Sequence, residues 1–407
     1  MINDNNFKID KDKKTIYLVT TSVGYNLKNS VGISWHCKKD GSYLLYKKES
    51  DSLFIKVMPC TNYWSIEEGY VEDSYQNKRY VCSVNLNNLD SKCKYVYQIV
   101  CEDIVSTPMT FTTSSMYDSK YSFMSFCDFQ YSENETTINL VKRFINENPT
   151  VNLITCSGDI ADEGYLEKSH RFLFDNKLFS NKILAFGCGD HEYWGSMVSP
   201  IKMLQQPYAY NKLFNNPKNG CDGYLNSSYY FKYNNLLFVF LNCGDSNIRY
   251  NNEMFSKQAI WLDKILTEEK DYEFIIVSMH KSLYGDIKQD SAIKKIAPIF
   301  IKVFDKYKVD LVISGHDHEY SRTKPLKNNE ENDNGTIYLD LGSSGDKRRN
   351  TGESVKSDVI YDKYIDIKEN SFSLGLVGTF ENNKLSLEIR NQYYDIVDKV
   401  EINLKNR

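Results

Sequence analysis

The stretch that decides the fold is Ser314-Gly315-His316-Asp317-His318-Glu319-Tyr320-Ser321-Arg322-Thr323, which follows the apolar run from Val309 to Ile313. An apolar run of this length predicts a buried strand, and two histidines spaced by one residue then project from its end. Side chains on such a rigid base can direct two imidazoles to one metal ion. A single His-x-His also occurs by accident in polar loops, so the rest of the sequence must decide.

Four more segments have the same pattern, in which an apolar run is followed by polar residues of the kinds that bind metal ions. They are Phe123–Cys127 before Asp128-Phe129-Gln130, Val151–Cys156 before Ser157-Gly158-Asp159, Ile183–Cys188 before Gly189-Asp190-His191-Glu192, and Phe274–Met279 before His280. Ligands in α/β proteins bind at the carboxyl ends of the strands. The sequence therefore predicts that one rim gathers six ligands: Asp128, Asp159, Asp190, His280, His316 and His318.

These six side chains favour particular metals. Three carboxylates and three imidazoles suit Fe, Zn or Mn, whereas a calcium site uses oxygen ligands alone. Without cations, three facing carboxylates repel one another and their pKa values rise. Two bound metal ions, divalent or trivalent, would remove that repulsion.

Length and charge bound the possible functions. The chain has 407 residues, enough for two domains, with 41% hydrophobic and 26% charged residues and a formal net charge of -4. This near balance predicts no electrostatic binding to nucleic acid or to an anionic membrane. No apolar run approaches the roughly 18 residues of a membrane-spanning helix.

The residues at the N-terminus and the cysteines bear on the compartment. The first residues, Met1-Ile2-Asn3-Asp4, lack a basic segment followed by an apolar core, so the sequence as given predicts a cytoplasmic protein. Removal of a signal peptide would make it a secreted one. Ten cysteines occur without CxxC pairs and several end apolar runs, which favours buried thiols over disulfides.

The spacing of apolar runs changes near residue 118. Residues 8–117 contain short strand-like runs with turn signals between them, which predicts an all-β sandwich of the immunoglobulin or fibronectin type. These runs are 15–20, 31–37, 43–47, 53–58, 79–86, 94–101 and 109–113. From residue 120 to 407, strands alternate with segments of helical period, which predicts an α/β domain. The expected helices are 135–148, 166–179, 258–269 and 292–307, and late strands at 372–378 and 384–390 are expected to complete a second sheet.

In this order, the five motifs resemble those of the calcineurin-like metallophosphoesterases: Asp-x-(His/Gln), Gly-Asp, Gly-Asn-His-(Glu/Asp), His and Gly-His-x-His. With the sandwich, Trp35 in Gly32-Ile33-Ser34-Trp35 and the run 315–323, the chain resembles a purple acid phosphatase. The resemblance spans nearly the whole chain. It implies a four-layer (αββα) catalytic domain over residues 120–407, preceded by the fibronectin-like sandwich.

The resemblance also implies a role for each ligand. One metal would be held by Asp128 and His318, with Gln130 as a possible further ligand, and Asp159 would bridge both metals. The other metal would be held by Asp190, His280 and His316. The implied activity is hydrolysis of phosphate esters, chiefly small-molecule monoesters, by in-line attack of a metal-bridging hydroxide, with His191 assisting the leaving group.

Three positions depart from the family pattern. Asp162 stands where purple acid phosphatases have their metal-binding Tyr, and Tyr165 comes three residues later, so a phenolate-to-iron colour is not expected. Asp162 and Tyr165 stay candidates for binding a metal ion or supporting its ligands. Asp190 replaces an Asn ligand, which adds a negative charge beside the substrate. No further His follows His280 before His316, although Lys281 or Tyr284 could take the place of a substrate-facing His.

Two questions stay open at this stage. The departures allow an alternative function, a weakened phosphoesterase that binds a phosphorylated ligand without cleaving it. The roles of neighbouring residues are also open. Glu192, Asp317 and Glu319 are expected to orient the ligands, whereas Tyr193-Trp194 fit either a substrate pocket or the core.

Overall fold

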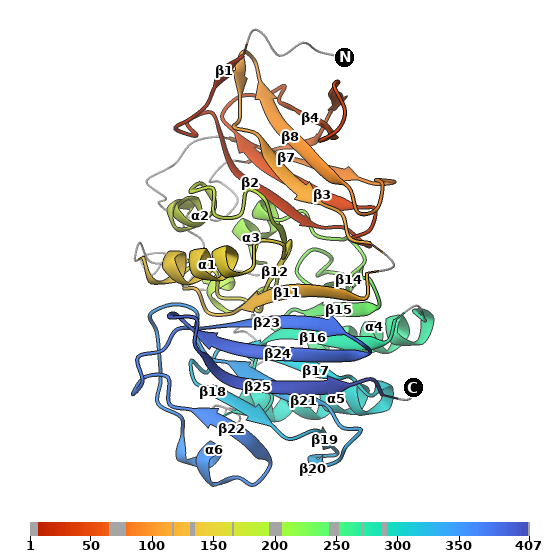
Figure 1. Cartoon of the computed structure of the whole chain (residues 1–407), viewed down its shortest axis with the longest axis vertical. Coiled ribbons are helices and arrows are strands. Elements are labelled where there is room, and N and C mark those ends of the chain that lie inside the picture. The colour runs from red at the N-terminus through yellow and green to blue at the C-terminus, as the bar shows by residue number, and fades with distance from the viewer. Residues whose placement is uncertain are drawn as a thin grey trace.

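The computed structural model describes residues 7–64, 79–115, 118–130, 135–164, 167–194, 206–243, 252–270, 272–285 and 291–405. The chain forms an N-terminal β-sandwich followed by an α/β domain, stacked along the long axis of the molecule (Figure 1). Both predicted architectures are confirmed.

One sheet of the sandwich has six strands in the order β1-β9-β8-β4-β5, with β10 paired to β8. Their bounds are β1 (Lys8–Ile9), β9 (Ile104–Val105), β8 (Lys94–Cys101), β4 (Tyr43–Lys48), β5 (Ile55–Val57) and β10 (Met109–Thr112). It packs on the other sheet of the sandwich around Trp35, which is fully buried and donates its indole N–H to Ser42 Oγ at 2.9 Å. That hydrogen bond satisfies the one polar atom of the ring in the core.

The strands facing this sheet belong to a ten-stranded sheet that runs through both domains. Its order is β25 (Ile396–Asn403), β24 (Lys384–Asn391), β23 (Leu374–Glu381), β11 (Lys120–Phe126), β12 (Leu153–Cys156), β13 (Ile183–Phe186), β2 (Ile16–Val23), β3 (Val31–Cys37), β7 (Arg79–Leu86) and β6 (Cys60–Trp64). The sequence did not predict this continuity. The late strands β23 and β24 join β11 here, so they extend this sheet instead of completing another one.

Strands β13 and β2 form the seam between the domains. They pair in parallel through Leu184 and Ser22 alone. The hydroxyls of Thr20 and Ser34 add to the seam by donating to the carbonyl of Leu213, each at 2.6 Å. Polar bonds of this kind fix the sandwich against the α/β domain.

A seven-stranded sheet carries the other motifs. Its order is β14 (Tyr229–Tyr233), β15 (Leu236–Leu241), β16 (Phe274–Lys281), β17 (Leu311–Gly315), β21 (Ile337–Leu341), β18 (Tyr320–Thr323) and β22 (Tyr361–Ile365). A short hairpin, β19 (Leu326–Lys327) and β20 (Glu330–Glu331), stands beside it.

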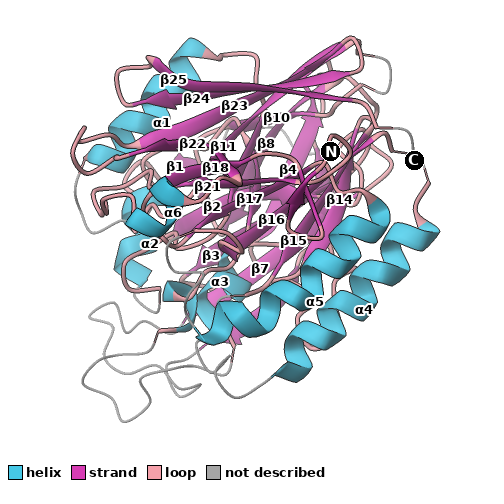
Figure 2. Cartoon of the chain, turned by 90° about the horizontal axis from the view of Figure 1, so that it is seen from below, coloured by secondary structure: helices cyan, strands magenta, loops and turns pink. Residues whose placement is uncertain are grey.

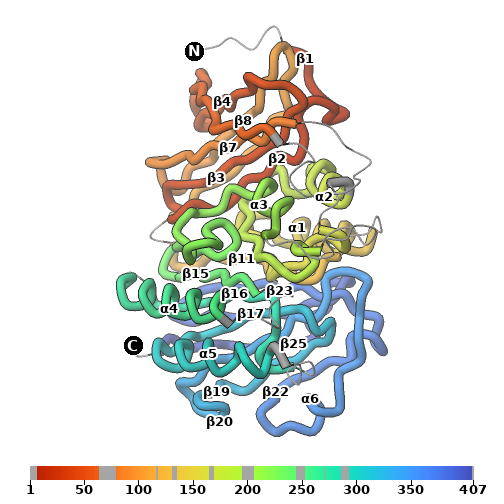
Figure 3. The backbone as a smooth tube through the Cα atoms, turned by 180° about the vertical axis from the view of Figure 1, so that it is seen from behind, coloured from red at the N-terminus to blue at the C-terminus, as the bar shows by residue number. Residues whose placement is uncertain are grey.

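Helices cover the outer faces of the two sheets. Their bounds are α1 (Thr136–Glu147), α2 (Glu167–Phe174), α3 (Tyr208–Leu213), α4 (Asn252–Glu268), α5 (Ser291–Tyr307) and α6 (Glu353–Ser357). Helices α4 and α5 lie side by side over the seven-stranded sheet (Figures 2 and 3), and α1 and α2 pack on the other one.

Alternation of side chains along the strands produces the four layers. On β11, Phe123 faces the core between the two sheets and Met124 faces the α1 side. On β17, Leu311 likewise faces the inter-sheet core and Val312 faces the α4–α5 side. Because successive side chains of a strand point to opposite faces, both faces must be apolar, as the continuous apolar runs predicted.

Candidate metal centre

Five strand ends meet at one rim of the α/β domain. Strands β11, β12 and β13 run parallel, and so do β15, β16 and β17, so the carboxyl ends of the two sheets face the same side. At the ends of strands in the ten-stranded sheet lie Asp128, Asp159 and Asp190. At the ends of strands in the seven-stranded sheet lie His280, His316 and His318. The structure therefore brings all six predicted ligands together.

The ligand atoms converge in overlapping groups. Those of Asp190, His280 and His316 lie within 4.8 Å of one another, as do those of Asp128, Asp159 and His280. Asp190 Oδ1 is 3.0 Å from both His280 Nε2 and His316 Nδ1. His318 Nε2 completes the other side at 3.3 Å from Asp128 Oδ1.

Asp159 belongs to two of the overlapping groups, one with Asp128 and His280 and one with Asp190 and His191. Its Oδ2 is 3.2 Å from His280 Nε2. A carboxylate shared by two clusters is suited to bridging two cations. This placement agrees with the role that the resemblance implied.

Backbone strain is concentrated at these residues. Asp128, Asp159, His316 and His318 have φ values of 46°, 53°, 75° and 54°, in the left-handed region that L-residues seldom adopt. Such strain persists only where the surroundings hold it, and it is typical of functional sites. The motif residues are thus held in conformations that a free loop would avoid.

Two glycines permit the close packing of the loops. A Cβ on Gly315 would lie 1.9 Å from Asp128 Oδ2, and one on Gly189 would lie 2.1 Å from Asp159 Oδ1. Both contacts are far inside van der Waals distance. The absence of a side chain at Gly315 and Gly189 therefore leaves room for the carboxylates of Asp128 and Asp159.

Glu192 ties two of the ligand loops together. Its buried carboxylate accepts backbone N–H groups from Asp159 at 3.0 Å, Ile160 at 2.8 Å and Gly189 at 2.7 Å. Burial raises the pKa of Glu192 to about 7, and the charge of Asp159 adds to the rise. Glu192 positions the ligands, as its neighbourhood in the sequence indicated.

The electrostatics of the rim call for cations. Burial lowers the pKa of His280, but the carboxylates of Asp159 and Asp128 outweigh burial and raise it well above its ordinary value. Asp190 Oδ1 is buried, and the nitrogens of His280 and His316 lie 3.0 Å from it. Burial raises the pKa values of Asp159 and Asp190, but the neighbouring histidines outweigh burial and lower both, so the predicted rise of the carboxylate pKa values is wrong. Histidines thus offset part of the carboxylate charge at the positions where metal ions would bind. The donor set therefore fits bound metal ions.

His191 projects into the rim from the 3₁₀ turn η2 (His191–Tyr193). Its Nδ1 is 2.5 Å from the carbonyl oxygen of Asp162, and its Nε2 is 2.9 Å from Gln130 Nε2. Gln130 Nε2 also donates to Asp159 Oδ2 at 3.0 Å. With Nδ1 donating to a carbonyl, Nε2 is the nitrogen directed at the cluster.

Asp162, one of the departures, does not join any of the ligand groups. Its carbonyl holds His191 and its carboxylate pairs with Lys347, which the sequence gave no reason to single out. Tyr165, the other candidate of that motif, lies outside the described residues.

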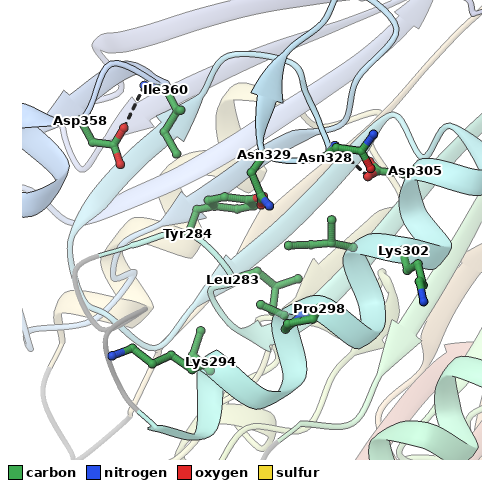
Figure 4. A pocket seen from close by; sticks show the side chains of 13 residues that line it. Leu283, Tyr284, Lys294, Pro298, Lys302, Asp305, Asn328, Asn329, Asp358 and Ile360 are labelled. Carbon is green, nitrogen blue, oxygen red and sulfur yellow. Dashed lines mark hydrogen bonds between the residues drawn. The ribbon is translucent and has the colours of Figure 1, made fainter.

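The two proposed substitutes for a substrate-facing His diverge. Lys281 Nζ lies 3.3 Å from His316 Nε2, at the rim. Tyr284 turns away and bonds to Asn329 in a separate hollow of about 620 Å³ between α5 and the β19–β20 turn (Figure 4). Of these two residues, Lys281 is therefore the one that lies at the rim.

Comparison with known proteins agrees with this geometry. The sequence model of the calcineurin-like phosphoesterases matches residues 116–320, half of the chain, and that of the purple acid phosphatase N-terminal domain matches residues 17–113. The chain therefore belongs to the calcineurin-like phosphoesterase family. Its fold is that of the purple acid phosphatases.

Three solved structures show the same fold at low sequence identity. Purple acid phosphatase PPD1 from yellow lupin seeds superposes with a TM-score of 0.80 at 15% identity, over 96% of this chain and 74% of that one. PhoD gives 0.64 at 11% identity, over 100% and 94%. GAP50, described as the anchor in the inner membrane complex of Plasmodium, gives 0.50 at 17%, over 71% and 90%.

An uncharacterised protein of Mycobacterium tuberculosis strain H37Rv is 31% identical over 75 residues. This match covers 17% of the chain and 14% of that relative.

None of the helices in the described ranges is long and apolar enough to cross a membrane. All ten cysteines are free thiols, eight of them buried.

Proposed function

We propose that the protein hydrolyses small-molecule phosphate monoesters with the help of two divalent metal ions. The observation that carries the proposal is the convergence of six ligands at one rim with Asp159 shared between the groups. One ion would be held by Asp128, Asp159 and His318, and the other by Asp159, Asp190, His280 and His316. When bound, such ions stabilise charge on the phosphoryl oxygens and lower the pKa of water toward neutrality.

The residues of the chain then divide the chemistry. A hydroxide attacks phosphorus in line, its oxygen forms the new P–O bond, and the P–O bond to the leaving alcohol breaks. Formation of the hydroxide from water releases a proton; His191, carrying a proton on Nε2 as well as on Nδ1, gives the Nε2 proton to the departing oxygen, so that alcohol and inorganic phosphate result. Lys281 at the rim supplies a positive charge for the phosphoryl group.

The test is metal-dependent turnover. The protein is stripped with a chelator, reloaded with Mn²⁺, Zn²⁺ or Fe²⁺, and assayed with an aryl monoester, an alkyl monoester and a diester while bound metal is counted. We expect activity to vanish on stripping, to return with about two ions per chain, and to be highest on monoesters. Full activity of the metal-free protein would exclude the proposal.

The alternative, a phosphate-binding protein without turnover, gives a different outcome. The reloaded protein would then bind phosphate by calorimetry without cleaving any of the three esters. Cleavage of the alkyl ester by the reloaded protein but not by a His191→Ala variant, which keeps all six ligands, would favour catalysis.

A further inference from the structure

Trp194 lies against the ring of His191. The two ring centroids are 3.8 Å apart and the planes differ by 26°, a stacked arrangement. The turn η2 produces the contact, because residues three apart lie on the same side of a 3₁₀ turn. The backbone N–H of Trp194 also donates to the carbonyl of His191 at 3.2 Å. Trp194 therefore contacts His191 both through its backbone N–H and through its indole ring.

The stack supplies a constraint that hydrogen bonds alone do not. The contacts of His191 Nδ1 with the Asp162 carbonyl and of Nε2 with Gln130 hold two points of the ring but allow its plane to turn about the line between them. A flat indole at 3.8 Å fixes the plane. The two contacts and the stack together set the orientation of the imidazole.

That orientation matters for the leaving group. Proton transfer needs donor and acceptor within hydrogen-bond reach in the transition state, so a small error in the ring plane costs rate. His191 is buried and Trp194 is half-buried, and the stacked indole covers one face of the imidazole.

We propose that Trp194 is a positioning residue that holds the His191 imidazole in the plane required to protonate the leaving group. The inference rests on the proposed function, since it assigns His191 the same proton. Other residues of this turn have different partners: Glu192 binds the ligand loops, and Tyr193 OH accepts from Asn242 Nδ2 at 2.6 Å. Trp194 is the residue of the turn whose ring meets the imidazole.

The first test compares leaving groups. An alkyl phosphate needs protonation of its oxygen, whereas a nitrophenyl phosphate departs with little help. We expect Trp194→Ala to lower kcat for the alkyl ester on the order of tenfold or more, with much less effect on the nitrophenyl ester and little change in KM. Trp194→Phe keeps an aromatic face and should restore most of the loss.

The matched control is Trp261→Phe. Trp261 lies on α4, where its indole N–H donates to the Asn219 carbonyl at 3.0 Å, away from the rim. The Trp261→Phe variant should leave the ratio of kcat for the alkyl ester to kcat for the nitrophenyl ester unchanged. An equal loss on both esters in Trp194→Ala, or no loss, would overturn the positioning role and leave the proposed function intact. If the reloaded wild type cleaves neither ester, the proposed function fails, and this inference fails with it.

The second test does not depend on turnover. In metal-free protein with labelled histidine, the ring protons of one of the six imidazoles should be shifted upfield by the indole. His191→Ala should remove that signal, and Trp194→Ala should return it to the ordinary range, while Trp261→Phe leaves it in place. An unshifted His191 signal in the wild-type protein would refute the stack itself.

Discussion

Two buried groups of charge in the α/β domain each draw residues from both of its sheets, and they are neutralised in different ways. At the end of β17, the rim gathers carboxylates whose internal counterions are histidines. On β18, the Arg322 guanidinium meets Asp398 at 2.8 Å and also pairs with Asp362, and Tyr320 OH donates to Asp398 at 2.7 Å. The second group, Arg322–Asp398–Tyr320, is complete within the chain.

The difference teaches which buried charges are structural. Burying a charge costs free energy unless a partner and hydrogen bonds offset the cost. The Arg322 group meets that condition with protein atoms alone. The rim meets it only in part, because its carboxylates have histidines as their counterions, and the charges of Asp159 and Asp128 must outweigh burial to raise the pKa of His280.

The largest effect is expected at the rim. His316→Ala removes a ligand, so the metal content should fall and kcat should drop by more than about 100-fold, the upper end of the effect of losing a residue that merely supports a ligand. Folding of the metal-free protein should be less affected than by Arg322→Met, because His316 is one of several histidine contacts to the carboxylates of the rim. Metal analysis and urea unfolding check both halves. A strongly destabilised metal-free variant would place the rim with the structural groups.

The reverse is expected for the Arg322 group. Arg322→Met leaves Asp398 buried without its partner, which should lower the free energy of unfolding by about 3–5 kcal/mol. Chelation should not change that loss. The exposed pair Lys384–Glu401, 2.9 Å apart, offers the control, since Lys384→Met should cost about 1 kcal/mol or less. Similar losses for both variants would show that Arg322 has no special role.

Glu192 should combine the two behaviours. In Glu192→Gln an amide N–H₂ replaces an oxygen that faces backbone N–H donors, so the loops of Asp159 and Asp190 lose an acceptor. We expect a loss of about 1–3 kcal/mol in unfolding free energy and metal affinity about 10–100-fold weaker. Glu381→Gln, at an exposed ion pair with Lys120, is the control and should change neither. Unchanged metal affinity would show that the loops hold their ligands without Glu192.

The smallest effect concerns the excess charge itself. Asp190→Asn keeps an oxygen ligand and removes one negative charge near the substrate, a change of about 1 kcal/mol at 4 Å in water. We expect kcat/KM to rise by up to about fivefold while the ion beside His280 binds more weakly. Kinetics and metal titration of Asp190→Asn and Asp190→Ala decide the point. If the two variants are equally damaged, the carboxylate has a role of its own.

The sequence placed the candidate ligands together because each of them lies within a few residues of the end of a strand. Apolar runs mark where β11 and β17 end, so Asp128 and His316 could be placed at one rim before any contact was known. The architectures of the two domains were predicted from local signals of the same kind. Successive short strands indicated the sandwich, and strands that alternate with helices indicated the α/β domain.

Contacts between distant segments carry no such signal. Arg322 and Asp398 are 76 positions apart, and nothing in either local sequence indicates that they pair. The carboxylate of Asp162 meets Lys347 across 185 positions, and only the folded chain shows that Asp162 serves His191. The stack of Trp194 on His191 is local, but the same two residues fit a core or a pocket until the turn is seen.

The seam between β13 and β2 has a consequence for how the chain is made. During synthesis β2 emerges first, yet its neighbour on one side, β13, follows only after the whole sandwich and both β11 and β12. Until then the edge of β2 is an open row of backbone donors and acceptors, the kind of surface that pairs with other chains. The sandwich of this protein is therefore finished by its catalytic domain, and a fragment ending before β11 is expected to aggregate where the full chain stays dispersed.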